Sequence, residues 1–214
     1  SKIEREKWAK KMADQGIHCK WFTPWPDGRL AFRPLDSITD LDAIAHLPIG
    51  ALHLNSCTNV LDITAITNLP LDDLYLDDVR VRDLSPIRGL KLTFLRASGH
   101  AVSDLSVLQG MPLESVDLSS TAVSNLSPLL GMPLKDINLD HTSIRDLKPL
   151  QGMRLQALSL WDTPVTDIEA LTGMPIERLD INHTLVKDIS PLRESPLEEL
   201  NMDGAEVTDI RVLE

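Results

Sequence analysis

Three residues spaced 21 positions apart carry the side chains of a nucleophile, a general base and an orienting acid. They are Ser120, His141 and Asp162. If their segments stack as neighbouring strands, their Cα atoms lie about 5 Å apart, in the order that a serine hydrolase needs. No glycine-rich elbow or oxyanion hole is evident around Ser120. The same column continues through residues that are typical of polar turns: Asp78, Gly99 and His183. A hydrolase is therefore an alternative prediction, and we expect a chain that is not an enzyme.

A second periodic column is almost entirely acidic. Its members recur every 21 residues: Asp62, Asp83, Asp104, Asn125, Asp146, Asp167, Asp188 and Asp209. A ladder of carboxylates suggests calcium, but the position just before a helical turn fits the capping of free N–H groups better. His141 and His183 are two repeats, or about 10 Å, apart, which is too far for one metal ion. We expect no metal and no cofactor, since the sequence also has no GxxxxGK[ST] phosphate loop and no kinase signature.

These columns arise from a 21-residue repeat. The pair Pro-Leu or its equivalent recurs at that interval: Pro70-Leu71, Lys91-Leu92, Pro112-Leu113, Pro133-Leu134, Arg154-Leu155, Pro175-Ile176 and Pro196-Leu197. Four residues after the start of each pair comes an apolar-x-apolar triplet, at 74–76, 95–97, 116–118, 137–139, 158–160, 179–181 and 200–202. The triplet 52–54 belongs to the series, one residue further away because Thr58-Asn59 lengthens its turn. A ninth copy is expected at 30–32. Seven copies at six equal steps establish a repeat architecture.

Each repeat contains one short strand and one short helical turn. The alternating triplet predicts a strand whose two outer residues point inward. Ser before Pro, as in Ser85-Pro86, suits an N-cap followed by the first helical position, and Gly89 ends the turn. Only a 3₁₀-like turn fits between them. A column of threonines predicts a hydroxyl ladder that satisfies buried backbone groups, with Cys57 as a core residue in the same register: Thr121, Thr142, Thr163 and Thr184.

The pattern L-x-x-L-x-L-x-x-T-x-V-x-D-L-x-P-L resembles the leucine-rich repeat, with Thr or Cys where the commonest consensus has Asn. Its length and its Asp-Leu-Ser-Pro-Leu segment resemble bacterial repeats of the internalin type, and even more the repeat regions attached to bacterial Ser/Thr protein kinases. The resemblance covers about residues 30–214. It implies an α/β repeat solenoid: a right-handed superhelix with a parallel sheet on the concave face and short 3₁₀ turns on the convex side. Such repeats serve many binding roles.

The two ends of the chain differ from the repeats. Residues 2–20 hold six basic and three acidic side chains, a net +3 that leaves −14 for the remainder. Ile3, Trp8 and Met12 fall at helical spacing, and a turn at 26–28 predicts a hairpin. We therefore expect a cap at 1–33 and repeats at 34–214 with an uncapped C-terminal end. A fragment, a further tail or an oligomer contact would each explain that end.

Composition excludes several classes of protein. The 214 residues are 43% hydrophobic and 25% charged, too apolar for a disordered chain, and no run approaches the about 18 apolar residues of a membrane span. A net charge of −11 argues against nucleic acid as a partner, and we expect no membrane partner either. Two cysteines and no signal sequence favour the cytoplasm.

The strand residues that face away from the core form three columns on the concave face. They hold eight carboxylates and three potential cations, together with aromatic side chains that no core requires. Since Trp, Tyr and Arg dominate binding hot spots, we predict a protein or peptide partner of basic character. The predicted contact residues are Tyr75, Phe94, Arg96, Asp117, Asn138, Asp140, Trp161 and Asp180. We expect a monomer or a segment of a larger chain, with a structural or self-assembly spacer as a further alternative.

Overall fold

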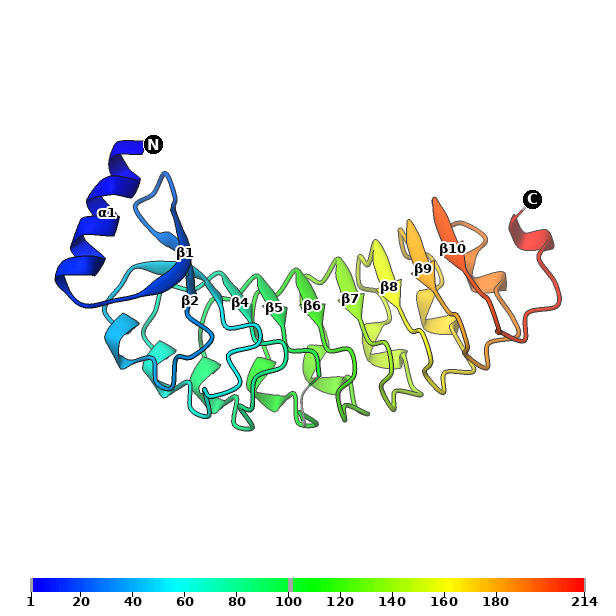
Figure 1. Cartoon of the computed structure of the whole chain (residues 1–214). Helices are drawn as coiled ribbons and strands as arrows, with labels where there is room; N and C mark the ends of the chain where they lie inside the picture. Colours follow the sequence, from blue (N-terminus) through cyan, green and yellow to red (C-terminus); the bar gives the residue numbers. More distant parts are fainter. Residues whose placement is uncertain (1, 100–101, 214) are drawn as a thin grey trace. The chain divides into compact units, whose positions relative to one another are not determined.

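The computed structural model describes residues 2–99 and 102–213. The chain divides into two compact units, Ser1–Arg96 (unit 1) and Ala97–Glu214 (unit 2), and each is described by itself. In both units short strands lie side by side along one side of the coils, and short 3₁₀ helices follow the other side (Figure 1). Each coil, meaning one strand, one 3₁₀ helix and their connections, corresponds to one repeat of the sequence.

Unit 1 begins with one α-helix and a hairpin and continues with three coils. Its elements are α1 (Lys2–Asp14), β1 (Cys19–Pro24), β2 (Leu30–Pro34), η1 (Asp42–Ile44), β3 (Ile49–His53), η2 (Thr64–Ile66), β4 (Asp73–Tyr75), η3 (Ser85–Ile87) and β5 (Phe94–Arg96), where η denotes a 3₁₀ helix. β1 pairs antiparallel with β2, and β2, β3, β4 and β5 pair parallel in that order. The expected ninth strand at 30–32 is therefore present as β2.

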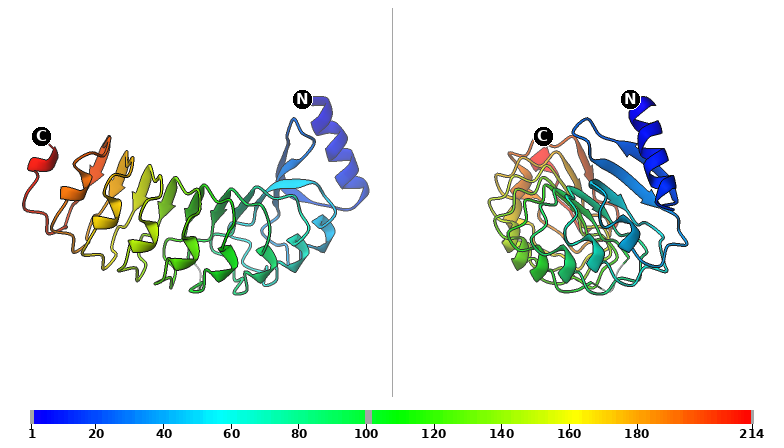
Figure 2. Two further views of the ribbon diagram at one scale, coloured as in Figure 1. Left: turned by 180° about the vertical axis from the view of Figure 1, so that it is seen from behind. Right: turned by 90° about the vertical axis from the view of Figure 1, so that its left-hand side faces the viewer.

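Unit 2 consists of coils alone. Its elements are η4 (Ser106–Leu108), β6 (Ser115–Asp117), η5 (Ser127–Leu129), β7 (Asp136–Asn138), η6 (Lys148–Leu150), β8 (Ala157–Ser159), η7 (Glu169–Leu171), β9 (Arg178–Asp180), η8 (Ser190–Leu192), β10 (Glu199–Asn201) and η9 (Arg211–Leu213). The five strands pair parallel, each with the next. Figure 2 shows the 3₁₀ helices of this unit following one another on the side away from its strands.

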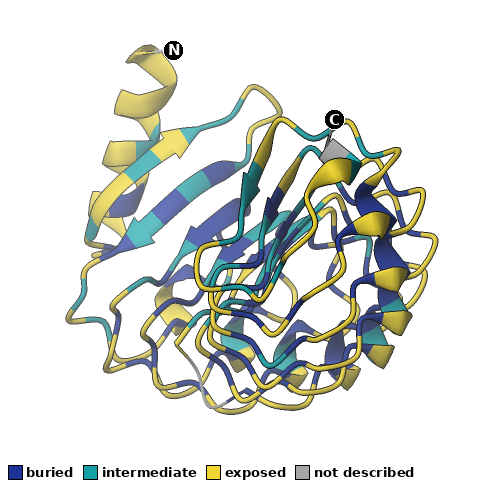
Figure 3. Cartoon of the chain, turned by 90° about the vertical axis from the view of Figure 1, so that its right-hand side faces the viewer, coloured by how far each residue is buried: buried dark blue, intermediate teal, exposed yellow. Residues whose placement is uncertain are grey.

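One apolar residue of each strand from β3 to β9, the middle one where the strand has three residues, points into the core. In unit 1 Leu52 pairs with Leu74, and Leu74 with Leu95. In unit 2 the same column runs through Val116, Ile137, Leu158 and Leu179. All are buried, and burial of one such side chain contributes roughly 1.5–3 kcal/mol. The predicted apolar spine is confirmed within each unit, and Figure 3 shows buried and intermediate residues alternating along several of the strands.

The threonine column closes the turns that follow β6, β7, β8 and β9 in unit 2. The Oγ1 atoms of Thr121, Thr142, Thr163 and Thr184 donate to the carbonyl three residues earlier, at 2.6–2.7 Å. The prediction that these hydroxyls satisfy buried backbone groups is confirmed, with each bond lying inside one coil. Cys57 is fully buried, as expected of a core residue.

The acidic column caps the 3₁₀ helices, and it does so in place of the serine that the sequence suggested. The Oδ1 atom of Asp83 accepts the backbone N–H of Ser85 at 2.7 Å, and its Oδ2 atom accepts the Ser85 hydroxyl at 2.8 Å. Asp62, Asp104, Asn125, Asp146, Asp167, Asp188 and Asp209 accept the equivalent N–H. Capping by this column is thus confirmed. The prediction of Ser85 as the N-cap is wrong, because Ser85 is the first residue of η3 and its hydroxyl donates to the aspartate.

The N-terminal helix and hairpin form as predicted, but the apolar stripe of the helix is hardly buried. Only Met12 of α1 is buried, and Ile3 is 76% exposed. The guanidinium of Arg5 lies 5.9 Å from the ring centroid of Phe22 on β1. Gly16 follows the helix at φ +69°, a conformation that glycine adopts without strain. Neither this 13-residue helix nor any other described helix has the length and hydropathy of a membrane span.

The last coil is more exposed than those before it. Leu200 and Met202 are only half-buried, whereas Leu179 and Ile181 in the preceding coil are buried. Ile210 is 53% exposed. Each earlier strand of unit 2 is followed by another strand, whose coil covers its apolar residues. In the described part of the chain no strand follows β10, so the apolar residues of the last coil are more exposed.

Replacing Asp146 by alanine should lower the free energy of unfolding by about 1 kcal/mol, because the amide of Lys148 loses its acceptor. Asp146→Asn is the matched control, since Asn125 already accepts the same bond one repeat earlier. Urea unfolding followed by circular dichroism measures both variants. Equal losses in the two variants would mean that the charge matters and the hydrogen bond does not.

The capping column also predicts how stability depends on acid. The hydroxyl of Thr64 lowers the pKa of Asp62, and backbone amides lower the pKa of Asp83 and Asp188. A group whose folded pKa is depressed contributes stability above its unfolded pKa of 3.8, and loses it as the pH falls through the folded value. The melting temperature should therefore fall steeply below about pH 4, and Asp83→Asn/Asp188→Asn should make that fall shallower. An unchanged acid profile in the double variant contradicts this assignment.

Candidate functional site

The eight predicted contact residues divide between the two units. Tyr75, Phe94 and Arg96 belong to unit 1, on β4 and β5, whereas the other five belong to unit 2. In each unit they lie on the sheet face opposite the buried core, here called the outward face. Because the two groups belong to different units, each is considered as its own surface.

Four rings on the outward face of unit 1 contact one another in sequence across its strands. Their centroids are separated by 4.8 Å (Trp21 to His53), 4.0 Å (His53 to Tyr75) and 4.8 Å (Tyr75 to Phe94). The rings of His53 and Tyr75 are stacked at 14°. We call these four residues the ring row. Trp21 is 37% exposed and the others are half-buried, so the row forms part of the protein surface.

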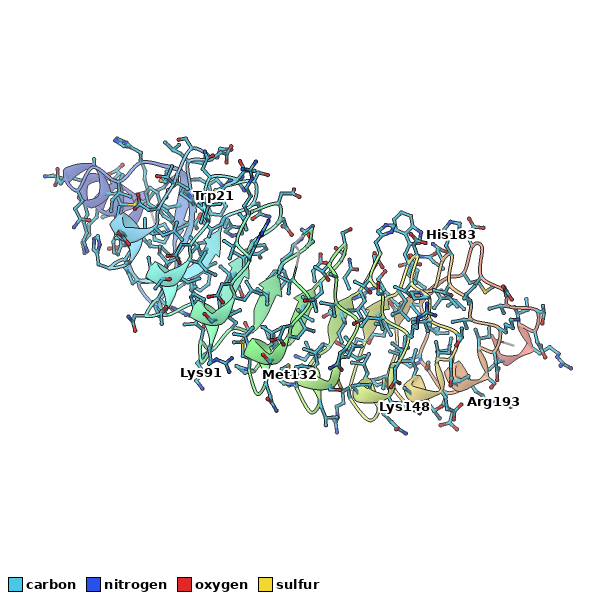
Figure 4. The ribbon with its side chains drawn as sticks, turned by 90° about the horizontal axis from the view of Figure 1, so that it is seen from below. Trp21, Lys91, Met132, Lys148, His183 and Arg193 are labelled. Carbon is cyan, nitrogen blue, oxygen red and sulfur yellow. The ribbon has the colours of Figure 1, made fainter. Side chains whose placement is uncertain are left out.

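Trp21 and His53 are contact residues that the sequence did not single out. His53 is one of the three potential cations in the outward columns, and its ring stacks on Tyr75. The signal was available, since His53 and Tyr75 hold the same strand position in adjacent coils. Trp21 depends on how the hairpin places β1, which no repeat pattern fixes. Figure 4 shows Trp21 on the edge of unit 1 opposite Lys91.

The charged groups beside the ring row are already organised. Asp77 is only 8% exposed, accepts a hydrogen bond from the Asn55 amide and pairs with Arg96, whose Nε lies 3.0 Å from Oδ1. Asp77, one of the eight carboxylates in the outward columns, is therefore not a solvated side chain. Asp77 comes two residues after the last residue of β4, and its carboxylate contacts the Arg96 side chain, which remains about half exposed. Arg96 is consequently held in a fixed place next to Tyr75.

Burial sets the protonation states within the row. Desolvation, and after it the Arg33 guanidinium, lowers the pKa of His53, so its ring is neutral at physiological pH. Desolvation and then the Asp73 carboxylate raise the pKa of Tyr75, which keeps the phenol protonated. The rings thus present uncharged π faces at neutral pH, a surface suited to apolar and cationic side chains.

The predicted polar contacts of unit 2 shape the ends of the strands. Asp117, Asn138 and Asp180 each accept the backbone N–H two residues later, at 2.9–3.0 Å. Asp140 accepts the Ser159 hydroxyl at 2.5 Å and the Trp161 amide at 2.9 Å. These side chains therefore serve the fold first, since each satisfies a backbone or hydroxyl donor of the turn.

Trp161 is the largest exposed side chain on the outward face of unit 2. It is 41% exposed, and its ring centroid lies 4.7 Å from that of His141. The Nδ1 atom of His141 lies 3.0 Å from Oδ2 of Asp162. Trp161 and His141 are therefore a second, smaller aromatic surface, in a different unit from the ring row.

The Ser120, His141 and Asp162 column marks a backbone turn that requires a left-handed residue. Their φ values are +57°, +55° and +54°, and the same turn has positive φ in other coils, at Ser56, Asp78, Gly99, His183 and Gly204. Glycine and short polar residues tolerate this conformation best, which accounts for the residue types in the column. In the described part of the chain no hydrogen bond joins Ser120 to His141, so only the His141–Asp162 pair of the hydrolase arrangement forms. In Figure 4 His183 lies on the edge of unit 2 opposite Met132, Lys148 and Arg193.

The carboxylates and histidines do not gather into a metal centre within residues 2–99 and 102–213. In that part of the chain no three His, Cys, Asp or Glu side chains come together. In the capping column, a carboxylate oxygen of each aspartate accepts a hydrogen bond from a backbone N–H instead. Burial raises the pKa of both free thiols, Cys19 and Cys57, which makes neither a reactive thiolate.

Comparison with solved structures gives several similar folds. An internalin, InlF, from Listeria monocytogenes is 27% identical with a TM-score of 0.71, over 82% of this chain and 53% of that one. Internalin C2 from the same species is 28% identical with a TM-score of 0.62, over 85% of this chain and 80% of that one. The functional domain of InlJ from Listeria monocytogenes, which includes a cysteine ladder, is 19% identical with a TM-score of 0.51 over 82% and 54%, a likeness of fold alone. The chain thus spans about half the length of InlF.

No protein-family model matches the chain, and no curated protein matches it in sequence. The family rests instead on the repeat pattern, the strand and 3₁₀ geometry, and the internalin structures. The sequence-based expectation of a leucine-rich-repeat solenoid is confirmed. The chain therefore has a leucine-rich-repeat fold that is similar to the folds of the bacterial internalins.

Proposed function

We propose that the chain is a non-catalytic module that binds a protein or peptide through the outward face of its sheet. Repeat solenoids present extended, preformed surfaces of this kind, and a rigid surface loses little entropy on binding. In a larger bacterial protein, such as one that carries a kinase domain, the module would supply recognition or regulation. The cytoplasmic location expected from the sequence stays a prediction.

The ring row is the observation that carries this proposal. An aromatic side chain on a solvent-facing sheet surface contributes nothing to the buried core, yet four of them contact one another in unit 1. Tyr and Trp provide large contact areas at low conformational cost, which is why they dominate binding hot spots. The row is therefore a preassembled anchor for a partner.

The partner's chemistry follows from the charge around the row. The chain beyond residue 20 carries a net −14, and neutral rings attract cationic side chains. A basic or amphipathic peptide segment fits both features, and the carboxylates would chiefly steer its approach. Trp161 and His141 would provide a further contact within unit 2.

Replacing Tyr75 and Phe94 together by alanine should weaken peptide binding by about 2 kcal/mol or more. The probes are peptides selected from a random display library on the immobilised wild-type chain, with affinities measured by isothermal titration calorimetry. Leu130→Ala is the matched control, because Leu130 is an exposed apolar residue at the 3₁₀ side of unit 2. It should change the affinity less than about twofold.

The melting temperature of each variant separates lost binding from lost folding. Selected peptides that bind the double variant as tightly as the wild type would remove the ring row from the site. A library that yields no binders above the level of a blank surface would contradict the binding function itself.

A further inference from the structure

One carboxylate next to the ring row has no partner in the described part of the chain. Asp73 is the first residue of β4, on the same face as Tyr75 two residues later. In the adjacent strands it lies opposite Ala51 and Phe94. Its side chain is half-buried and forms neither a hydrogen bond nor an ion pair with any residue in 2–99 or 102–213.

The cations near Asp73 are committed to other carboxylates. Arg29 places Nη2 2.6 Å from Oδ2 of Asp72 and Nε 2.8 Å from Oδ2 of Asp27. Arg96, opposite Tyr75, is paired with Asp77. Both arginines are therefore paired with other carboxylates, and Asp73 is a further negative charge beside the rings.

The surroundings of Asp73 disfavour the charged form of its carboxyl group. Burial first, and then the neighbouring Asp72, raise the pKa of Asp73, while Arg29 lowers it only in part. A carboxyl whose folded pKa is raised destabilises the fold at any pH where it is ionised. Residues that reduce stability in this way are often retained for binding, because a ligand supplies the missing interaction.

We propose that Asp73, with the ring faces of Tyr75 and Phe94, forms a subsite for an arginine or lysine side chain of the bound peptide. This inference rests on the proposed function of the ring row. An arginine fits best, since its planar guanidinium can stack on an aromatic ring and donate two hydrogen bonds to a carboxylate. A metal ion fits poorly, because one carboxylate offers too few ligands, and none of the described residues add enough others.

The test compares Asp73→Asn with Asp78→Asn. Both variants remove one negative charge from the same coil, and Asp78 lies at a left-handed turn, φ +54°, where asparagine is well tolerated. Peptides selected on the wild type should be enriched in arginine or lysine. Asp73→Asn should weaken them by about tenfold, and Asp78→Asn by less than about twofold.

A matched change in the peptide makes the assignment specific. Replacing the peptide's arginine by glutamine should also cost about tenfold, and combining it with Asp73→Asn should add little further loss. Independent losses, or equal losses in the two asparagine variants, would overturn the subsite. Peptides that depend on Tyr75 and Phe94 but carry no arginine or lysine would overturn it while the proposed function stands. Peptides that do not depend on the rings would overturn both.

The unliganded protein gives a second readout that requires no peptide. Asp73→Asn should raise the melting temperature at neutral pH, because the amide carries no charge to desolvate. Asp78→Asn, at an exposed turn, should leave it unchanged. A lower melting temperature in Asp73→Asn would show that the carboxylate stabilises the fold, which contradicts the inference.

Discussion

Every coil of this protein must place its apolar residues in register with the apolar residues of the neighbouring coils. One coil cannot bury its leucines alone, and a parallel strand shifted by one residue would turn its apolar side chains toward solvent. The constant length of 21 residues meets this requirement. The exception is informative, because the coil that contains Thr58-Asn59 has one more residue and yet Leu52 still pairs with Leu74. The extra residue is accommodated in the turn, and the strand keeps its position.

The same requirement explains why most of the periodic polar residues serve the fold. Each coil has to turn sharply after its strand and again before its 3₁₀ helix, and each turn leaves backbone groups without partners. A left-handed residue, a buried threonine and an aspartate resolve these needs in several coils of unit 2, as at His141, Thr142 and Asp146. A periodic polar column is therefore weak support for catalysis or metal binding in such a fold. Outward strand residues whose type varies from coil to coil are better candidates, and Asp73 and the ring row are of this kind.

Much of the fold was predictable from sequence because the repeat samples the same physical problem several times. The strands, the 3₁₀ turns, the buried Leu74 and Leu95, and the capping role of Asp83 all follow from spacing. The residue that supplies the capping oxygen could not be predicted from spacing. Ser85 and Asp83 are both favoured residue types at a helix start, and only the geometry shows that Asp83 accepts the hydrogen bond. The candidate site was partly predictable. Tyr75 and Phe94 were found from their outward positions, whereas Trp21 depends on the hairpin, and the burial of Asp77 under Arg96 depends on side-chain packing that spacing cannot specify.

The stacking of neighbouring coils, and with it the ring row, can be measured directly by nuclear Overhauser effects from the tyrosine ring. The chain contains a single tyrosine, so signals from its ring protons are unambiguous. With centroid separations of 4.0 Å to His53 and 4.8 Å to Phe94, the Tyr75 ring should show cross-peaks to both neighbouring rings. Cross-peaks to neither ring, or to residues one position along β3 and β5, would contradict the register on which the spine, the ring row and the Asp73 subsite all depend.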